Sequence, residues 1–170
     1  MSDAPDPRPA SASHVTLTQM MEVTDANVAG HVHGGVIMRL ADTAAGLAAI
    51  RHAGGLCVTV SVDELTFREP VHVGDVVTLR ASVNHVGTTS LECGVRVDAE
   101  NPITGRRVHA ATAYFVFVAL DADGRPREVP PLEVTSDTER RRQRAAVLRR
   151  EARLAHKEAL RRDEAASASS

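Results

Sequence analysis

Residues 36–53 read VIMRLADTAAGLAAIRHA, and the helix that this stretch predicts organises everything around it. Apolar residues occupy nearly every side of that helix, and small alanines and a glycine run through its middle. A helix that is apolar almost all round is buried, and its small side chains let a sheet approach closely. Gly54 and Gly55 end it. The stretch therefore predicts a central helix inside the domain.

Runs typical of β-strands lie on both sides of this helix in the sequence. They span residues 16–23, 57–68, 76–86, 90–100 and 108–120. Short turn sequences separate the last four runs, so we expect antiparallel neighbours. Residues 77–83 and 91–97 alternate between apolar and polar, which predicts one covered face. The sequence therefore favours an α+β class with five antiparallel strands around one helix.

The chain has 170 residues, enough for one domain with tails but cramped for two. We expect a disordered N-terminal tail over residues 1–14, a domain over 15–134, a basic C-terminal helix over 135–164 and a disordered tail over 165–170. The capping-box sequence at residues 136–139 opens the second helix. Its narrow apolar stripe consists of Ala145, Leu148, Ala152, Ala155 and Ala159. We expect this helix to dock along a subunit or to cover a partner's surface.

The formal net charge of -2 hides an asymmetry along the chain. From Ser136 onward there are 10 Lys/Arg against 6 Asp/Glu, which leaves 10 against 16 for the rest. Two interpretations stay open at this point. The basic segment is a solvated helix stabilised by i,i+4 ion pairs, or it presents a phosphate-facing surface to a nucleotide-bearing ligand or RNA.

Several classes of function lose their main sequence support. Cys57 and Cys93 have no C-x-x-C spacing, which argues against a disulfide framework or a zinc site. His31 and His33 form an H-x-H pair, but no further ligands follow at a metal-binding spacing, so we expect no metal. The motifs G-x-S-x-G, Walker A and G-x-G-x-x-G after a strand are absent. A serine hydrolase, an NTPase and a dinucleotide enzyme are therefore disfavoured.

Residues 1–13 lack a hydrophobic targeting region, and no stretch reaches about 18 apolar residues. We expect neither export by a standard signal nor a membrane span, and the cysteine usage fits a reducing compartment. These features favour a cytoplasmic location.

Asp42 is the one acid in the middle of the predicted apolar helix. Burying a carboxylate is costly unless it has partners, and acids in such places often act as general bases. The alternative is an acid satisfied by nearby hydroxyls such as that of Thr43, or one that faces solvent through a gap in the core.

Gly34 and Gly35 precede this helix, where free backbone N–H groups could stabilise an oxyanion. The alternative is a tight loop that needs unusual backbone angles. Asn27 lies just upstream and offers a donor and an acceptor to orient water or a carbonyl. Taken alone, an Asn in a turn more often serves the turn itself.

A series of ordered matches resembles the hotdog-fold acyl-CoA thioesterases of the cytosolic and brain acyl-CoA hydrolase group. The similarity covers residues 16–150. The matching segments are 25–35 (DANVAGHVHGG), the helix that carries Asp42, Val62-Asp63 with Phe67, 70–75 (PVHVGD), Thr89-Ser90, 101–105 (NPITG) and 129–131 (VPP). Any one of these matches would be weak, but the ordered set is specific.

The resemblance implies a hotdog fold, a long helix wrapped by a curved antiparallel sheet and paired with a second unit, often as a trimer of dimers. Two-domain members place a catalytic Asn on one unit and a catalytic Asp on the other. This chain has one unit and carries both residue types, at Asn27 and Asp42. By resemblance, a homodimer would combine Asn27 of one subunit with Asp42 of its neighbour.

The implied activity is hydrolysis of acyl-CoA to a free fatty acid and CoA, as in fatty acid metabolism. Asp42 would activate a water or attack the thioester directly, Asn27 would orient the water or the carbonyl, and the Gly34 and Gly35 amides would hold the oxyanion. The family's CoA contacts map to Val60, Ser61, Val62, Thr89, Ser90, Leu91 and Arg150. No cofactor is implied, because CoA is part of the substrate and product.

Rival functions stay open at the level of sequence. A non-catalytic hotdog protein could bind acyl-CoA for regulation, and a hotdog hydratase is conceivable. A nucleic-acid-associated protein could use the basic helix, although the acidic body and the few aromatic residues argue against nucleic acid.

Overall fold

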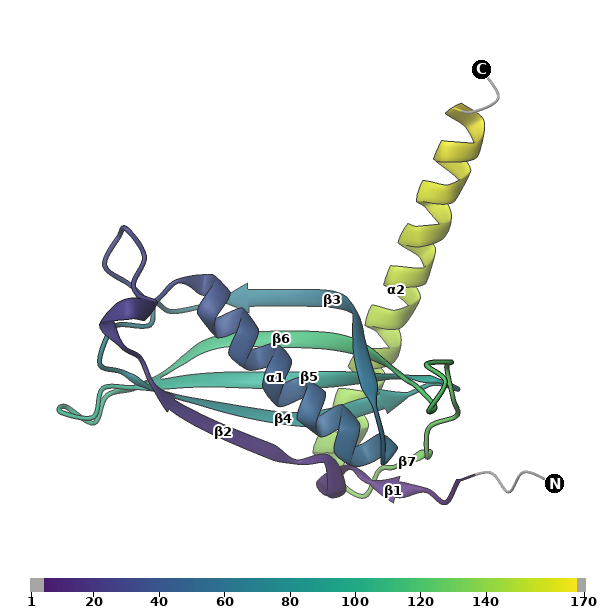
Figure 1. The fold of residues 1–170 in the computed structure, drawn as a ribbon, viewed down its shortest axis with the longest axis horizontal. Coiled ribbons are helices and arrows are strands. Elements are labelled where there is room, and N and C mark those ends of the chain that lie inside the picture. Colours follow the sequence, from purple (N-terminus) through teal and green to yellow (C-terminus); the bar gives the residue numbers. More distant parts are fainter. Residues whose placement is uncertain (1–4, 168–170) are drawn as a thin grey trace.

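A computed structural model describes residues 5–167 of the chain (Figure 1). In order, the elements are β1 (Arg8–Pro9), a 3₁₀ turn (Ala10–Ser13), β2 (Val15–Met20), a second 3₁₀ turn (Val23–Asp25), α1 (Gly34–Ala53), β3 (Cys57–Phe67), β4 (Val76–Val86), β5 (Ser90–Glu100), β6 (Arg107–Ala119), β7 (Leu132–Glu133) and α2 (Asp137–Ser167). The predicted long central helix, five main strands and C-terminal helix are all confirmed.

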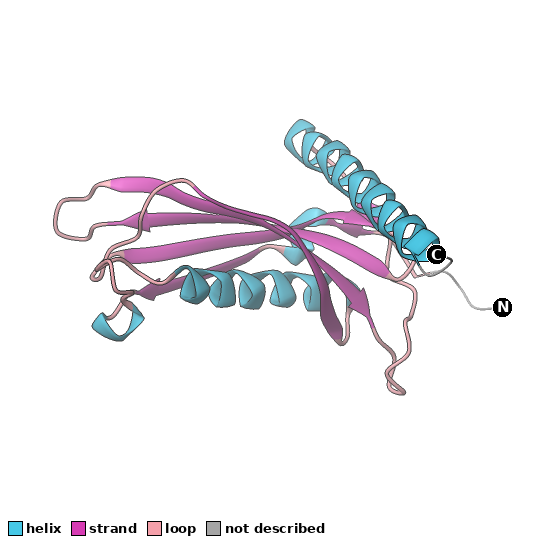
Figure 2. Cartoon of the chain, turned by 90° about the horizontal axis from the view of Figure 1, so that it is seen from above, coloured by secondary structure: helices cyan, strands magenta, loops and turns pink. Residues whose placement is uncertain are grey.

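One antiparallel sheet forms the body of the molecule, with strand order β2-β4-β5-β6-β3. The strands β2 and β3 are its edges, and within the described residues 5–167 β3 pairs only with β6. Helix α1 covers one face of the sheet, and the long helix α2 lies on the other side (Figure 2). The sheet therefore separates an inner face that carries the core from an outer face that carries α2.

The core lies between α1 and the inner face of the sheet. Five alanines of α1 are completely buried: Ala41, Ala44, Ala45, Ala48 and Ala49. Opposite them lie the inward side chains of the strands, including Leu79, Cys93, Phe115 and Phe117. A Cβ atom added at Gly46 would lie 3.6 Å from Phe117, so a small residue keeps that contact close. The small residues of the central helix thus have the packing role that the sequence predicts.

The prediction of a disordered tail over residues 1–14 is wrong for residues 8–13. Arg8 caps the end of α1, with its Nη1 donating to the backbone oxygens of Arg51 at 3.2 Å and His52 at 2.9 Å. Ser13 is fully buried, and its hydroxyl accepts from the Val83 N–H at 2.9 Å. These contacts order the segment because they satisfy polar groups that would otherwise be unpaired. Residues 1–4 lie outside the described residues.

Helix α2 is longer than predicted. It continues to Ser167, so residues 165–167 are helical, and residues 168–170 lie outside the described part. Ala146 is its one buried residue in the described range, whereas Leu148 of the predicted stripe is 66% exposed. Ionic contacts, and not apolar burial, hold α2 on the sheet of its own chain, and docking of the apolar stripe on a partner's surface stays a prediction.

Candidate active site

Asn27 organises the loop that leads into α1. Its Oδ1 accepts from the Ala29 N–H at 2.9 Å and the His31 N–H at 3.2 Å. Its backbone N–H donates to the His31 oxygen at 2.7 Å. Within residues 5–167, the side-chain Nδ2 has no acceptor. The loop therefore occupies the acceptor end of the amide and leaves the donor end available.

The two glycines at the start of α1 are not equivalent. Gly35 donates its N–H to Nδ1 of His33 at 2.9 Å, and His33 is the N-cap residue of the helix. Neither Gly34 nor Gly35 has a positive φ, so unusual backbone angles do not explain them. A Cβ atom on Gly34 would lie 3.1 Å from the Phe67 ring. Of the two amides, only that of Gly34 has no partner in the described part of the chain.

An open cavity of about 340 Å³ lies at this end of α1. It is lined by Asn27, His31, Val32, Gly34, Ile37, Phe67, Arg68, Glu69, Pro70 and Val71. The structure thus brings Asn27 and Gly34 to one cavity whose remaining walls include several apolar side chains. Such a mixture suits a ligand with a polar carbonyl and an apolar chain.

Asp42 lies elsewhere, half-buried in the middle of α1. Its Oδ1 accepts a hydrogen bond of 2.8 Å from Oγ1 of Thr59 on β3. Thr43 is not its partner, because the Thr43 hydroxyl donates to the Arg39 backbone oxygen. The hydroxyl contact holds the carboxylate at the open edge of the sheet.

Asn27 and Asp42 of one chain do not meet. Asp42 follows Gly34 by eight residues, which corresponds to about 12 Å along a helix axis. Asp42 also does not line the cavity that contains Asn27 and Gly34. A single site with both side chains would therefore need two chains.

The residues predicted to contact CoA lie at the other end of α1, around the β4–β5 turn and the first half of β3. Val60 and Val62 are 55% and 45% exposed, and β-bulges interrupt the register of β3 at both places. Thr89 and Ser90 lie at the turn, where the Gly87 N–H donates to the Ser90 oxygen. Leu91 is 1% exposed, which leaves its side chain no surface for a ligand.

Helix α2 places basic side chains beside this second region. Arg150 is exposed and has no carboxylate partner in the described residues. His85 of β4 lies near it, and burial, followed by the charge of Arg150, lowers the pKa of this imidazole. The structure therefore places Arg150 near His85, at the end of β4 that leads into the β4–β5 turn.

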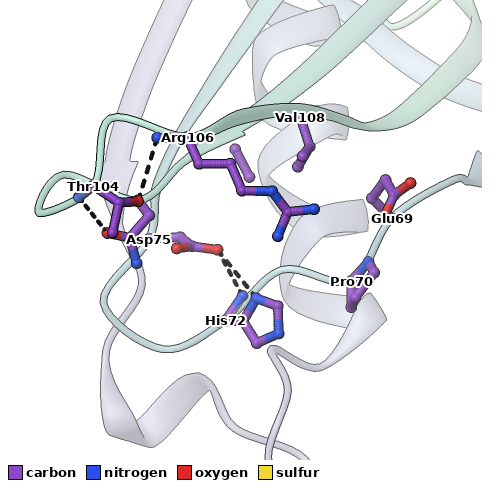
Figure 3. A pocket seen from close by; sticks show the side chains of 9 residues that line it. Glu69, Pro70, His72, Asp75, Thr104, Arg106 and Val108 are labelled. Atoms are coloured by element: carbon purple, nitrogen blue, oxygen red, sulfur yellow. Dashed lines mark hydrogen bonds and ion pairs between the residues drawn. The ribbon is translucent and has the colours of Figure 1, made fainter.

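A second cavity, of about 350 Å³, adjoins the Asn27 cavity and shares Glu69 and Pro70 with it. Figure 3 shows its walls, with Arg106 and His72 facing each other. Asp75 accepts from the His72 N–H at 2.9 Å and lies 3.5 Å from its Nδ1. Neither Asn27 nor Asp42 lines it. We therefore assign no chemistry to this cavity.

The histidines near Asn27 form ring contacts with each other. The rings of His31 and His72 lie 5.0 Å apart in an edge-to-face arrangement. Among residues 5–167 no group of three or more His, Cys, Asp or Glu side chains is placed to hold a metal ion. No helix in the same range is both long and apolar enough to cross a membrane.

Sequence reasoning missed two residues of this region, Thr59 and His33. Thr59 contacts Asp42 across 17 positions, so no local pattern links them. His33 had been considered as a metal ligand, whereas it caps α1. Histidine is not among the residue types that favour N-caps, so the sequence carries no clear signal for this role.

Comparisons with known proteins agree with this architecture. Residues 29–105 match the family model described as "Thioesterase superfamily". The "Uncharacterized acyl-CoA thioester hydrolase YkhA" of Bacillus subtilis is 35% identical over 161 residues, which cover 93% of this chain and 94% of that protein. The cytosolic acyl coenzyme A thioester hydrolase of Mus musculus is 35% identical over 140 residues. These cover 81% of this chain, which spans only 37% of the mouse protein.

Solved structures give the same result. One is an acyl-CoA hydrolase from Staphylococcus aureus in complex with butyryl-CoA, CoA and CoA disulfide. It has a TM-score of 0.85 at 30% identity, and the match covers 92% of this chain and 95% of that chain. A hexameric acyl-CoA thioesterase has a TM-score of 0.86 at 33% identity, with 89% and 97% covered. Variants of the S. aureus hydrolase with alanine in place of an Asp, an Asn or a Thr also have solved structures. The chain therefore belongs to the hotdog-fold acyl-CoA thioester hydrolases of the thioesterase superfamily.

Proposed function

We propose that this protein hydrolyses acyl-CoA to a free fatty acid and CoA, at sites that combine Asn27 of one subunit with Asp42 of another. The observation that carries the proposal is the placement of the two side chains. Asn27 presents a free amide donor in a cavity at one end of α1, and Asp42 presents a carboxylate at the open edge of the sheet. Each is positioned to act, and each lacks the other within its own chain.

The two side chains divide the chemistry between a base and a donor. Thr59 donates to Oδ1 of Asp42, so Oδ2 remains free to take a proton from water as the water attacks the thioester carbon. The carbon–sulfur bond then breaks, the CoA thiolate leaves, and the proton from Asp42 can return to its sulfur. Direct attack by Asp42 is the alternative route.

Asn27 stabilises charge on the carbonyl oxygen or orients the water through Nδ2, because Oδ1 is already occupied by two backbone N–H groups. The Gly34 amide, free at the start of α1, adds a second donor. Gly35, predicted to share this role, has its N–H committed to His33 in the chain alone. Two donors and one base suffice for a thioester, since thiolate is a good leaving group.

CoA is held at the opposite end of α1. We infer contacts from Val60, Ser61 and Val62 of β3, from Thr89, Ser90 and the Leu91 backbone, and from Arg150. The S. aureus relative binds CoA. Its solved alanine variants replace an Asp, an Asn and a Thr. The number of each is one higher than that of Asp42, Asn27 or Thr59 in this chain. The constant offset supports the assignment of Asp42, Asn27 and Thr59 to the catalytic site, and the CoA bound to the relative supports a CoA site in this fold.

Self-association completes the site in this proposal. The 11-residue strand β3 is an open sheet edge, and apolar side chains along it and along α1 are exposed, including Val58, Val60, Leu47 and Ile50. Long apolar edges of this kind need a partner. A second copy would cover them, and hexameric relatives support a trimer of dimers. We infer a cytoplasmic location from the cytosolic mammalian relatives.

Free-thiol release from a panel of acyl-CoAs tests the proposal. Wild type should release CoA, whereas Asp42→Ala and Asn27→Ala should each lower kcat by about a hundredfold or more at unchanged oligomer size. Asn27→Asp keeps the Oδ1 bonds of the loop but loses the donor, so it should be as inactive as Asn27→Ala.

Asn101→Ala is the matched control, because Asn101 also accepts two backbone N–H bonds in a turn, from Ile103 and Thr104. It should keep wild-type activity. A wild-type protein that binds acyl-CoA but releases no thiol across the panel would support the regulatory function instead.

A further inference from the structure

The docking of α2 on the sheet depends on two arginines, four residues apart on one face of the helix. Arg149 makes a two-pronged contact with Glu92 of β5, Nε to Oε2 at 3.1 Å and Nη2 to Oε1 at 2.7 Å. Arg153 forms an ion pair with Asp63 of β3. The acids are almost completely covered, with side-chain exposures of 4% and 6%.

Apolar burial contributes little to this junction. Ala146 is the single buried residue of α2 in the described part of the chain, and its methyl group is small. The Arg149 guanidinium carbon lies 3.5 Å from the centre of the Tyr114 ring, so this side chain is both stacked and ion-paired. The orientation of α2 is therefore set by the two arginines.

β-Bulges lie at one of the acids, Asp63, and beside the other, Glu92. A bulge in β3 between Val62 and Glu64 displaces Asp63, and one in β4 between Val83 and His85 displaces Asn84. Asn84 then donates to Oε1 of Glu92 at 3.2 Å, and the Ser61 hydroxyl donates to Oδ1 of Asp63 at 3.1 Å. The second of these bonds links Arg153 through Asp63 to a strand residue inferred to contact CoA.

From this geometry we propose that Arg149 and Arg153 are positioning residues that hold α2, and with it Arg150, against the CoA-binding end of β3 and the β4–β5 turn. The inference rests on the proposed function, because it assigns their role in binding the nucleotide part of acyl-CoA. Arg149 is not itself free to bind phosphate, since Glu92 and Tyr114 occupy its guanidinium and its side chain is 19% exposed. It acts through Arg150.

The two ion pairs differ in whether lysine can replace the arginine. Lysine can retain a single ion pair such as that between Arg153 and Asp63, but it cannot reproduce the fork on Glu92 or the stacking on Tyr114. Arg153→Lys should therefore behave as wild type, whereas Arg149→Lys should resemble Arg149→Ala. A role that depended on positive charge alone would let both lysines rescue.

The test compares butyryl-CoA with butyryl-pantetheine, which lacks the nucleotide and its phosphates, as substrates of the full-length oligomer. Arg149→Ala, Arg149→Lys and Arg153→Ala should raise KM for butyryl-CoA by roughly tenfold, the effect of losing one hydrogen bond to a charged group. The kcat for butyryl-CoA should not change, and neither should kcat/KM for butyryl-pantetheine. Arg161→Ala removes the same charge from α2 at an arginine whose one ion pair among residues 5–167 is with Glu158 of the same helix, and should leave both substrates unaffected.

Equal losses on both substrates would show a general structural role and overturn the inference, as would an unchanged KM for butyryl-CoA in Arg149→Ala. Removing one partner of a buried pair can unfold a protein. Normalising each rate to the folded fraction corrects for unfolding. The lysine variants add a test in which the positive charge is kept. Titration with CoA alone separates failure of the proposed hydrolysis: if wild type hydrolyses neither substrate, a roughly tenfold weaker Kd for CoA in Arg149→Ala still supports positioning.

Discussion

Two asparagines with nearly the same local role show why single residues resist interpretation from sequence. Both Asn27 and Asn101 use Oδ1 to accept two backbone N–H groups in a turn. Only Asn27 lies beside the free amide of Gly34 in the cavity at the start of α1. The candidate role of Asn27 therefore arises from its surroundings and not from its turn chemistry.

His52 gives the stability of the protein a pH dependence. The residue is fully buried at the end of α1, with Nε2 at 2.9 Å from the Pro130 oxygen, and Nδ1 has no partner within the described residues. Burial lowers the pKa of this imidazole below its usual 6.5, and Arg8 adds to the effect. In the unfolded chain His52 therefore binds a proton as the pH falls through about 6.5, whereas in the folded chain it stays neutral to lower pH.

The free energy of unfolding should consequently fall as pH drops below about 6.5, by at most about 1.4 kcal/mol per pH unit from this group. Thermal melts of wild type and His52→Gln at pH 7.5 and 5.5 measure it. We expect wild type to lose more Tm between the two pH values than His52→Gln, with exposed His156→Gln as the control that matches wild type. Equal losses in His52→Gln and wild type would remove His52 as the cause.

At the scale of elements, α1 and β3 share an exposed apolar surface that needs a partner. Leu47 and Ile50 of α1 are 42% and 39% exposed, and Val58 and Val62 of β3 are 38% and 45% exposed. The proposed dimer covers both elements at once. Assembly and catalysis should therefore fail together.

Leu47→Lys tests this coupling without altering Asn27 or Asp42. Burying an unpaired ammonium costs several kcal/mol, which should weaken association and lower thioesterase activity together by about two orders of magnitude or more. Light scattering after size-exclusion chromatography measures the assembly. Ile103→Lys, at a hairpin residue 92% exposed, is the matched control and should keep both size and activity. A fully active monomer would contradict a shared site.

The main strands could be predicted closely because their cues are local. The expected runs 76–86 and 90–100 coincide with β4 and β5, and the central helix ends at Ala53 as expected. Alternation and turn residues fix such bounds without knowledge of distant contacts. The resemblance added the hotdog arrangement, which the structure confirms.

Features that depend on contacts between distant segments could not be predicted in this way. Arg8 caps α1 across more than forty positions, and Arg127 donates to the Ala53 oxygen across 74. Glu92 and Arg149 are 57 positions apart. No local pattern identifies such pairs, so the N-terminal segment was expected to be disordered and the ionic contacts of α2 with the sheet were not predicted.

At the scale of the whole molecule, the acidic body and the basic helix neutralise each other where they meet. Glu92 and Asp63 of the sheet take up Arg149 and Arg153, while Arg150 keeps its charge exposed. Ion pairs within the helix, such as that between Arg162 and Glu158, stabilise its far end, and we propose that the exposed charge near the turn binds phosphate.

Mixing of two inactive variants tests the division of the site between subunits. Asn27→Ala and Asp42→Ala chains would be co-expressed in equal amounts with different tags, and the hetero-oligomers isolated by tandem purification. Each heterodimer then holds one site with Asn27 from one chain and Asp42 from the other, and one site that lacks both. The homo-oligomers of either variant hold no intact site.

Thiol release by the unsorted mixture should return to about a quarter of the wild-type rate, since about half of randomly formed dimers are mixed and each has one intact site of two. The purified hetero-oligomer should reach about half of the wild-type rate if it is a dimer, and about a quarter if it is a trimer of randomly mixed dimers. A mixture that stays as inactive as the separate variants, with hetero-oligomers present, would show that each chain needs both residues itself and would contradict the shared site.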